Sequence, residues 1–138
     1  MLLQVRKENG YQYVESGQGP CVILLHGLFG ALSNFSSLFQ ALADNYRVII
    51  PLLPIFDTEN KDSSVDALTQ YVKSFLDFKE ISRCTLVGNS LGGHIGLVFA
   101  LENPERVNAL VLTGSSGLFE SGMGSSYPRR GDYDFIRL

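Results

Sequence analysis

Short apolar runs alternate along this chain with stretches whose spacing favours helices. The apolar runs at residues 21–25, 46–50 and 85–87 are typical of strands buried on both faces, and residues 107–112 are a fourth predicted strand. Between them, helices are predicted over residues 33–44, 65–78 and 91–102. Strands that alternate with helices of this length form right-handed crossovers. The pattern therefore predicts an α/β fold, a mostly parallel sheet with helices on both faces.

Two local signals refine this prediction. Residues 2–7 and 11–15 are prone to form strands, and the intervening Asn9-Gly10 pair suits the tight turn of an antiparallel hairpin. Ser63 is the expected N-cap of the second helix, with Asp66 three residues later completing a capping box. Asp66 is therefore interpreted as a residue that starts a helix and not as a catalytic acid.

Composition narrows the class of protein. Of 138 residues, 45% are hydrophobic and 18% are charged, values that fit a globular domain and not a disordered chain. The net charge of −3 includes no sustained basic run, so nucleic-acid binding is not expected. No apolar stretch approaches the roughly 20 residues of a membrane span and no signal peptide is visible, so a cytoplasmic protein is expected. Neither a cofactor nor a metal site is predicted.

The two cysteines, Cys21 and Cys84, are too few for a disulfide framework and are expected to be buried thiols.

One motif carries candidate chemistry. Residues 88–92 read Gly-Asn-Ser-Leu-Gly and match Gly-x-Ser-x-Gly. The pattern is weak alone, but here a predicted strand (83–87) precedes it and a predicted helix (91–102) follows it. A nucleophile elbow needs that context, with Gly88 and Gly92 leaving room for a strained turn around Ser90. We therefore predict that Ser90 is a nucleophile. The alternative is an incidental turn.

A second motif lies at the end of the first predicted parallel strand, where His26-Gly27 opens a glycine-rich loop. Acyl transfer needs two backbone N–H groups that converge on the tetrahedral oxyanion. Leu91, directly after the nucleophile, is one candidate donor, and Leu28 or alternatively Phe29 is the other. Gly27 lets this loop turn tightly. An ordinary glycine-rich connection is the alternative reading.

Together, residues 22–27 (Val-Ile-Leu-Leu-His-Gly) and 86–94 (Leu-Val-Gly-Asn-Ser-Leu-Gly-Gly-His) resemble the α/β-hydrolase fold superfamily, in its serine esterase and carbon–carbon bond hydrolase branch. The resemblance implies a sheet whose first strand pairs antiparallel and whose next strands run parallel. It also implies that this chain lacks the last strands of the fold. Residues 1–113 are thus expected to be the N-terminal part of the core. Residues 114–138 are expected to be a Gly/Ser-rich tail where the family inserts a lid.

The rest of a catalytic triad is not visible. In this family the triad follows the order Ser, then Asp or Glu, then His. The resemblance implies that His26 organises its loop, while His94 is expected on a helix flank, and no carboxylate directly follows Thr113. Without a base, Ser90 is a poor nucleophile, so this chain alone is expected to be nearly inactive. The acid and histidine are expected beyond Leu138, in a longer hydrolase.

The leading hypothesis is a serine hydrolase that acts on an ester, a thioester or a similar small-molecule acyl substrate, including a ketone with a cleavable carbon–carbon bond. Two alternatives remain open: a non-catalytic binding module of the same fold, and one half of a split enzyme. The strand at 107–112 would be left as an open edge in this chain, which predicts self-association through it.

Overall fold

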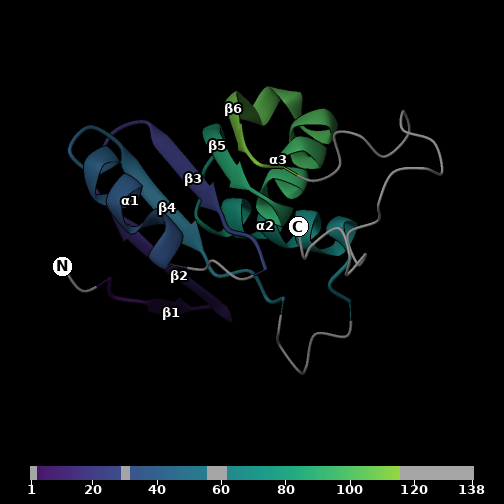
Figure 1. Cartoon of the computed structure of the whole chain (residues 1–138), viewed down its shortest axis with the longest axis horizontal. Helices are drawn as coiled ribbons and strands as arrows, with labels where there is room; N and C mark the ends of the chain where they lie inside the picture. Colours follow the sequence, from purple (N-terminus) through teal and green to yellow (C-terminus); the bar gives the residue numbers. More distant parts are fainter. Residues whose placement is uncertain (1–2, 29–31, 56–61, 116–138) are drawn as a thin grey trace, which may run out of the picture.

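Six strands form one mixed sheet in the computed structural model, which describes residues 3–28, 32–55 and 62–115 (Figure 1). Their order across the sheet is β1-β2-β4-β3-β5-β6. The strands β4, β3, β5 and β6 run parallel, whereas β1 and β2 pair antiparallel at one side. This is the predicted α/β sheet. The strands are β1 (Arg6–Glu8), β2 (Tyr11–Ser16), β3 (Cys21–Leu25), β4 (Arg47–Pro51), β5 (Cys84–Asn89) and β6 (Val107–Thr113).

The predicted hairpin joins β1 to β2. Asn9 and Gly10 have φ angles of 51° and 81°, the two positive values that a tight two-residue hairpin turn requires. The turn pairs Glu8 with Tyr11 and turns β2 back along the sheet. The expected antiparallel opening is therefore confirmed, although β1 is shorter than the predicted strand at residues 2–7.

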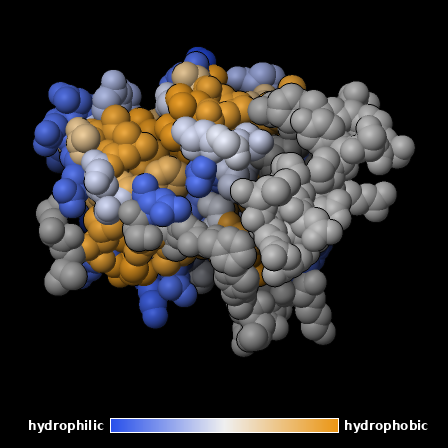
Figure 2. Space-filling model, in the orientation of Figure 1, coloured by the Kyte–Doolittle hydropathy of each residue, from blue (hydrophilic) through white to orange (hydrophobic). Residues whose placement is uncertain are grey.

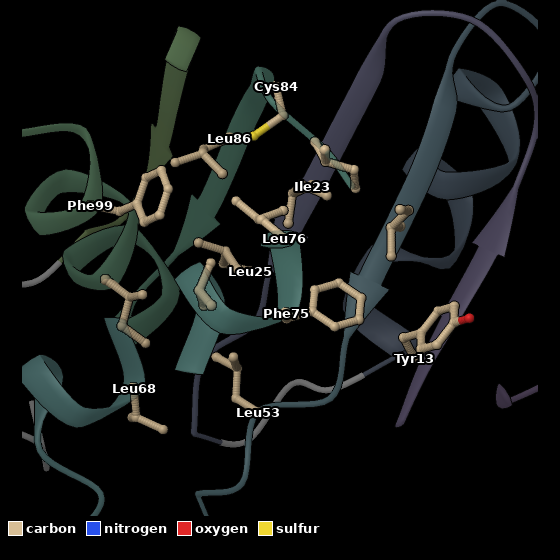
Figure 3. Close-up of a cluster of buried hydrophobic side chains, with 14 of the residues drawn as sticks. Tyr13, Ile23, Leu25, Leu53, Leu68, Phe75, Leu76, Cys84, Leu86 and Phe99 are labelled. Atoms are coloured by element: carbon tan, nitrogen blue, oxygen red, sulfur yellow. The ribbon is translucent and has the colours of Figure 1, made fainter. Parts of the chain in front are cut away.

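Helices cover both faces of the sheet, as predicted. The helix α1 (Ser36–Leu42), preceded by a 3-10 turn at Ser33–Phe35, lies on one side, and α2 (Val65–Phe78) and α3 (Leu91–Glu102) lie on the other (Figure 1). A further 3-10 turn at Pro104–Arg106 leads from α3 into β6. The larger apolar cluster forms where α2 and α3 meet the strands (Figure 3). Its fully buried members include Ile23, Leu25, Leu86, Leu68, Phe75, Leu76 and Phe99.

The start of α2 differs by one residue from the prediction. Ser64, and not Ser63, is the N-cap, and its hydroxyl accepts a hydrogen bond from the backbone N–H of Ala67 at 3.2 Å. The predicted capping box is therefore wrong, because the third helical residue is Ala67 and not an acid. Asp66 lies in the first turn, where a negative charge interacts favourably with the helix dipole.

The strand β6 is less buried than the other parallel strands. Its residues are all exposed or half-buried, and Val111 is 46% exposed. The reason is that within the described residues β6 pairs with β5 alone and α3 covers only one of its faces. Figure 2 shows hydrophobic surface on this view beside α1 and again at the top, where Figure 1 places β6.

Both cysteines are free thiols that begin neighbouring strands, Cys84 buried and Cys21 half-buried. Burial raises the pKa of Cys84 to about 12 and that of Cys21 to about 11, so both are poorly reactive. This agrees with their expected role in packing. In the part of the chain that the structure describes, no helix is long and apolar enough to cross a membrane.

A group of charges lies at the amino end of the parallel strands, which we call the Glu15 cluster (Glu15, Arg47 and Lys79). The Glu15 carboxylate lies 2.7 Å from Arg47 Nε and 2.8 Å from Lys79 Nζ, and its side chain is 12% exposed. Burial would raise the pKa of Glu15, but the bonds from Lys79 and Arg47 outweigh burial and lower it. Lys79 also donates to the Tyr13 hydroxyl at 3.1 Å. The cluster thus connects β2, β4 and the end of α2.

Candidate active site

Ser90 lies in the sharp turn between β5 and α3, as the motif predicts. Its backbone angles, φ 55° and ψ −118°, are sparsely populated by residues other than glycine. The Ser90 N–H donates to the Thr113 carbonyl oxygen at 3.3 Å, and its own carbonyl accepts from the His94 N–H at 3.2 Å. The serine is therefore held between the end of β6 and the first turn of α3.

The two motif glycines allow the backbone to pack tightly around this turn. A Cβ on Gly88 would lie 2.5 Å from the Gly92 carbonyl oxygen. A Cβ on Gly92 would lie directly on the carbonyl oxygen of Leu25, at the end of β3. No side chain fits at either position. This contact between backbones is what the sequence pattern anticipates at a nucleophile elbow.

The loop after β3 lies directly against Ser90. A Cβ on Gly27 would lie 3.0 Å from Ser90 Cβ and 3.5 Å from Ser90 Oγ, so Gly27 adjoins the hydroxyl-bearing side chain. The next residue, Leu28, is half-buried and packs against the larger core cluster, and Leu91 in the first turn of α3 is buried in that cluster. Both predicted oxyanion donors thus belong to segments that meet at Ser90. Phe29, the alternative donor, lies outside the described residues.

His26 connects two loops at the carboxyl end of the sheet. Its Nδ1 donates to the Gly27 carbonyl oxygen at 2.8 Å, and its Nε2 accepts from the Leu53 N–H at 2.9 Å. Burial lowers the pKa of His26, partly offset by the bond to Gly27, so the ring is held neutral. Because both ring nitrogens are engaged, His26 has no lone pair left to serve as a general base.

The other histidine, His94, is half-buried on α3, one turn after Ser90. The sequence directly after Thr113 reads Gly-Ser-Ser, without a carboxylate. Within residues 3–28, 32–55 and 62–115, no three His, Cys, Asp or Glu side chains gather closely enough to hold a metal ion. What the described residues bring together is a strained serine, a neighbouring loop and the amino end of a helix, where N–H groups and the helix dipole favour negative charge.

Thr113 is a site residue that the sequence analysis does not predict. Its hydroxyl lies 3.2 Å from Asn89 Oδ1, and Asn89 directly precedes the serine. The register of the β5–β6 pair brings Thr113 opposite Asn89. Register between strands cannot be read from either strand alone, so this contact appears only in the structure.

The chain is similar in sequence and in structure to known proteins. The family model of the alpha/beta hydrolase fold matches residues 20–137. A 2-hydroxy-6-oxo-6-phenylhexa-2,4-dienoate hydrolase of Burkholderia cepacia is 38% identical over 115 residues, which cover 75% of this chain and 39% of that protein. The crystal structure of an alpha/beta hydrolase enzyme from a lagoon-sediment metagenome is similar with a TM-score of 0.79 and 43% identity, covering 85% of this chain and 54% of that one.

A meta-cleavage product hydrolase of Pseudomonas fluorescens is similar with a TM-score of 0.74 and 32% identity, covering 83% of this chain and 45% of that one. The present chain therefore spans between 39% and 54% of the length of these three proteins.

Proposed function

The chain belongs to the alpha/beta hydrolase fold family, and on that premise we propose that it supplies the nucleophile and the oxyanion hole of a serine hydrolase. The observation that carries this proposal is the strained backbone of Ser90, which has a φ of 55°. Gly27 packs against the turn that contains Ser90. Residues keep such strained angles only where the surroundings enforce them, and such positions cluster at functional sites.

In the proposed reaction, Ser90 Oγ attacks the carbonyl carbon of the substrate while a general base removes the hydroxyl proton. The carbonyl oxygen becomes an oxyanion, which accepts hydrogen bonds from the backbone N–H groups of Leu28 and Leu91. The leaving group departs with the proton from the base, leaving an acyl group on Ser90. Water, which gives a proton to the base, then attacks the acyl carbon; the bond to Ser90 Oγ breaks, Oγ takes the proton back from the base, and the acyl group leaves as a carboxylic acid.

Two classes of substrate fit this mechanism. Esters and thioesters lose an alcohol or a thiol, whereas an acyl ketone loses a carbon leaving group. The names of the two relatives, a dienoate hydrolase and a meta-cleavage product hydrolase, favour including the second class. A panel that contains p-nitrophenyl esters of increasing chain length together with 2-hydroxy-6-oxo-6-phenylhexa-2,4-dienoate would distinguish them by their kcat/KM values.

We propose that the general base and its acid partner lie in a longer protein of which these residues are the amino-terminal part. Two observations support this: both ring nitrogens of His26 are engaged, and the chain spans about half or less of the relatives it matches. The intact mass of the protein expressed from its natural gene tests it. A species much heavier than the 15.2 kDa of this chain is expected, and a mass equal to it would contradict the proposal.

The decisive test of the nucleophile is labelling by a fluorophosphonate, which reacts with activated serines. The protein expressed from its natural gene is expected to gain one phosphonyl group on the peptide that contains Ser90, and Ser90→Ala is expected to remove it. Ser74→Ala, which changes an exposed serine of α2, is the matched control and should remain labelled. Absence of label from folded protein would contradict the hydrolase and favour a non-catalytic binding module.

The outer edge of β6 has no partner strand within the described residues, and we propose that these 138 residues expressed alone self-associate through it. Light scattering at micromolar concentration should then give a mass above that of one chain. Val111→Lys on β6 should restore the monomer, because a lysine on an edge strand opposes pairing. Leu101→Lys, which changes an exposed apolar residue of α3 (74% exposed), is the control and should still associate. A wild-type monomer would refute the idea.

A further inference from the structure

The end of β6 holds three consecutive residues of the elbow. The Thr113 carbonyl oxygen accepts the Ser90 N–H at 3.3 Å. The Thr113 hydroxyl lies 3.2 Å from Asn89 Oδ1 and 3.4 Å from the Gly88 carbonyl oxygen. Asn89 and Thr113 are also the last paired residues of the β5–β6 ladder. A single residue therefore contacts Gly88, Asn89 and Ser90 by three different polar interactions.

The chain after Thr113 continues around the same turn. Gly114 has a φ of 60°, so the backbone changes direction there. The side chain of Ser115 then lies over the first turn of α3, because a Cβ on Gly93 would be 2.7 Å from Ser115 Cβ. The end of β6 thus contacts the elbow on the strand side and on the helix side.

This arrangement matters because the Ser90 backbone does not hold its angles by itself. A strained conformation persists only where several neighbours fix it. The Ser90 N–H donates to the Thr113 carbonyl oxygen, a bond that joins the strained turn to the end of β6. The hydroxyl of Thr113 carries one proton, and the nearer acceptor is the carboxamide of Asn89. Holding Asn89 restrains the residue from which the turn begins.

We propose that Thr113 is a positioning residue, which fixes the conformation of Ser90 through the Asn89 carboxamide and the Ser90 N–H. The inference rests on the proposed function in so far as Ser90 is the nucleophile. It goes beyond that function in naming a group that does not touch the substrate. Its hydroxyl acts on the rate of attack and not on the binding of substrate.

The first experiment measures kcat and KM for an ester in the protein expressed from its natural gene. Thr113→Val keeps the branched shape and removes the hydroxyl, and we expect kcat to fall about fivefold with KM unchanged, the size of effect of one hydrogen bond. Thr113→Ser restores the hydroxyl and should restore kcat. Asn89→Ala combined with Thr113→Val should lower kcat no further than Asn89→Ala alone, because the two residues act as one unit.

A second measurement does not depend on activity. Hydrogen exchange of the Ser90 amide, followed by NMR in the same proteins, reports directly on the bond to the Thr113 carbonyl. We expect faster exchange at Ser90 in Thr113→Val and the wild-type rate in Thr113→Ser. The Leu68 amide, whose hydrogen bond to the Ser64 carbonyl oxygen lies within the first turn of α2, should exchange equally in all three proteins.

The kinetic and hydrogen-exchange measurements distinguish the hydrolase proposal from the positioning role of Thr113. If the wild-type protein is inactive while Ser90 exchange still responds to Thr113→Val, the hydrolase proposal fails and the positioning role stands. If the protein is active and Thr113→Val matches the wild type in both kcat and Ser90 exchange, the positioning role is wrong. Equal acceleration of exchange at Ser90 and Leu68 would show a general loss of stability and would also contradict it.

Discussion

The two ends of the parallel strands are stabilised in different ways. At the carboxyl end, the elbow around Ser90 packs backbone against backbone, and its strained residue is held by neutral hydrogen bonds. At the amino end, the Glu15 cluster joins β2, β4 and α2 through a carboxylate whose nearest cations are Arg47 and Lys79. The elbow contains strain and no ion pair, whereas the cluster contains ion pairs and ordinary backbone angles.

This difference indicates a division of roles. Strain at a defined serine is unfavourable for folding and is useful only where the geometry of one atom matters. A shared carboxylate contributes to stability and fixes no reacting atom. We therefore expect changes at the elbow to affect activity more than stability, and changes at the Glu15 cluster to do the reverse.

The largest effect is expected from Ser90→Ala. Loss of a triad nucleophile costs about 10⁴-fold or more in kcat, so hydrolysis by the protein expressed from its natural gene should fall by at least that factor. The melting temperature should not fall, because the Ser90 hydroxyl contributes little to the hydrophobic core. Ser90→Gly should be equally inactive and more stable by about 1 kcal/mol, since glycine relieves the strain. A drop in stability in both variants would contradict the assignment of strain.

The next largest effect is expected from Gly92→Ala. A methyl group at this position would overlap the Leu25 carbonyl oxygen, and backbone cannot move aside as a flexible side chain can. We expect a loss of about 3 kcal/mol or more, or failure to fold. The control is Gly10→Ala in the hairpin turn, where nothing lies within 4 Å of the new Cβ and only the positive φ of 81° opposes it. That change should cost about 1 kcal/mol by urea denaturation.

At the other end of the strands, Glu15→Gln should lower the free energy of unfolding by about 2 kcal/mol, because two cations lose their charged partner in a mostly buried site. The ion pair of Asp77 with Arg106 supplies the control. Its N–O distance is 2.6 Å, but the Asp77 side chain is 59% exposed, so Asp77→Asn should cost less than about 1 kcal/mol. Neither change should alter kcat. Equal losses from the two would contradict the role given to burial.

A smaller effect is expected in acid. The pKa of Glu15 in the folded protein lies below its ordinary value of 4.5, so the unfolded chain binds the proton more readily. The stabilisation by Glu15 is therefore complete above about pH 4.5 and is lost as the pH falls through the lowered folded pKa. Urea denaturation of the wild type and of Glu15→Gln at pH 7, 5, 4 and 3 should show a gap that narrows only below pH 5. A constant gap would contradict this.

The contrast also shows what the sequence can predict. The bounds of α3 match the prediction, because an elbow signal precedes it and Asn103-Pro104 ends it. The N-cap of α2 was misplaced because two adjacent serines can each cap, and only the backbone conformation selects Ser64. The sequence predicts β6 as a strand from its apolar residues, but how far its faces are exposed depends on the rest of the fold.

The candidate site also contains residues that the sequence predicts and contacts that it does not. Ser90, Gly88 and Gly92 could be found in the sequence, because the steric demands of the turn leave a local signature. Thr113 and the bond from Leu53 to His26 could not, since each joins residues more than 20 positions apart. Such contacts depend on strand register and loop path, which no local pattern specifies.

The most direct test of the account is a crystal structure of the phosphonylated protein, expressed from its natural gene. A fluorophosphonate adduct mimics the tetrahedral intermediate, so its phosphonyl oxygen stands where the oxyanion would form. We expect the phosphorus on Ser90 Oγ and the phosphonyl oxygen about 2.7–3.1 Å from the backbone nitrogens of both Leu28 and Leu91. A phosphonyl group on another residue, or an oxygen that points away from both nitrogens, would contradict the proposed site.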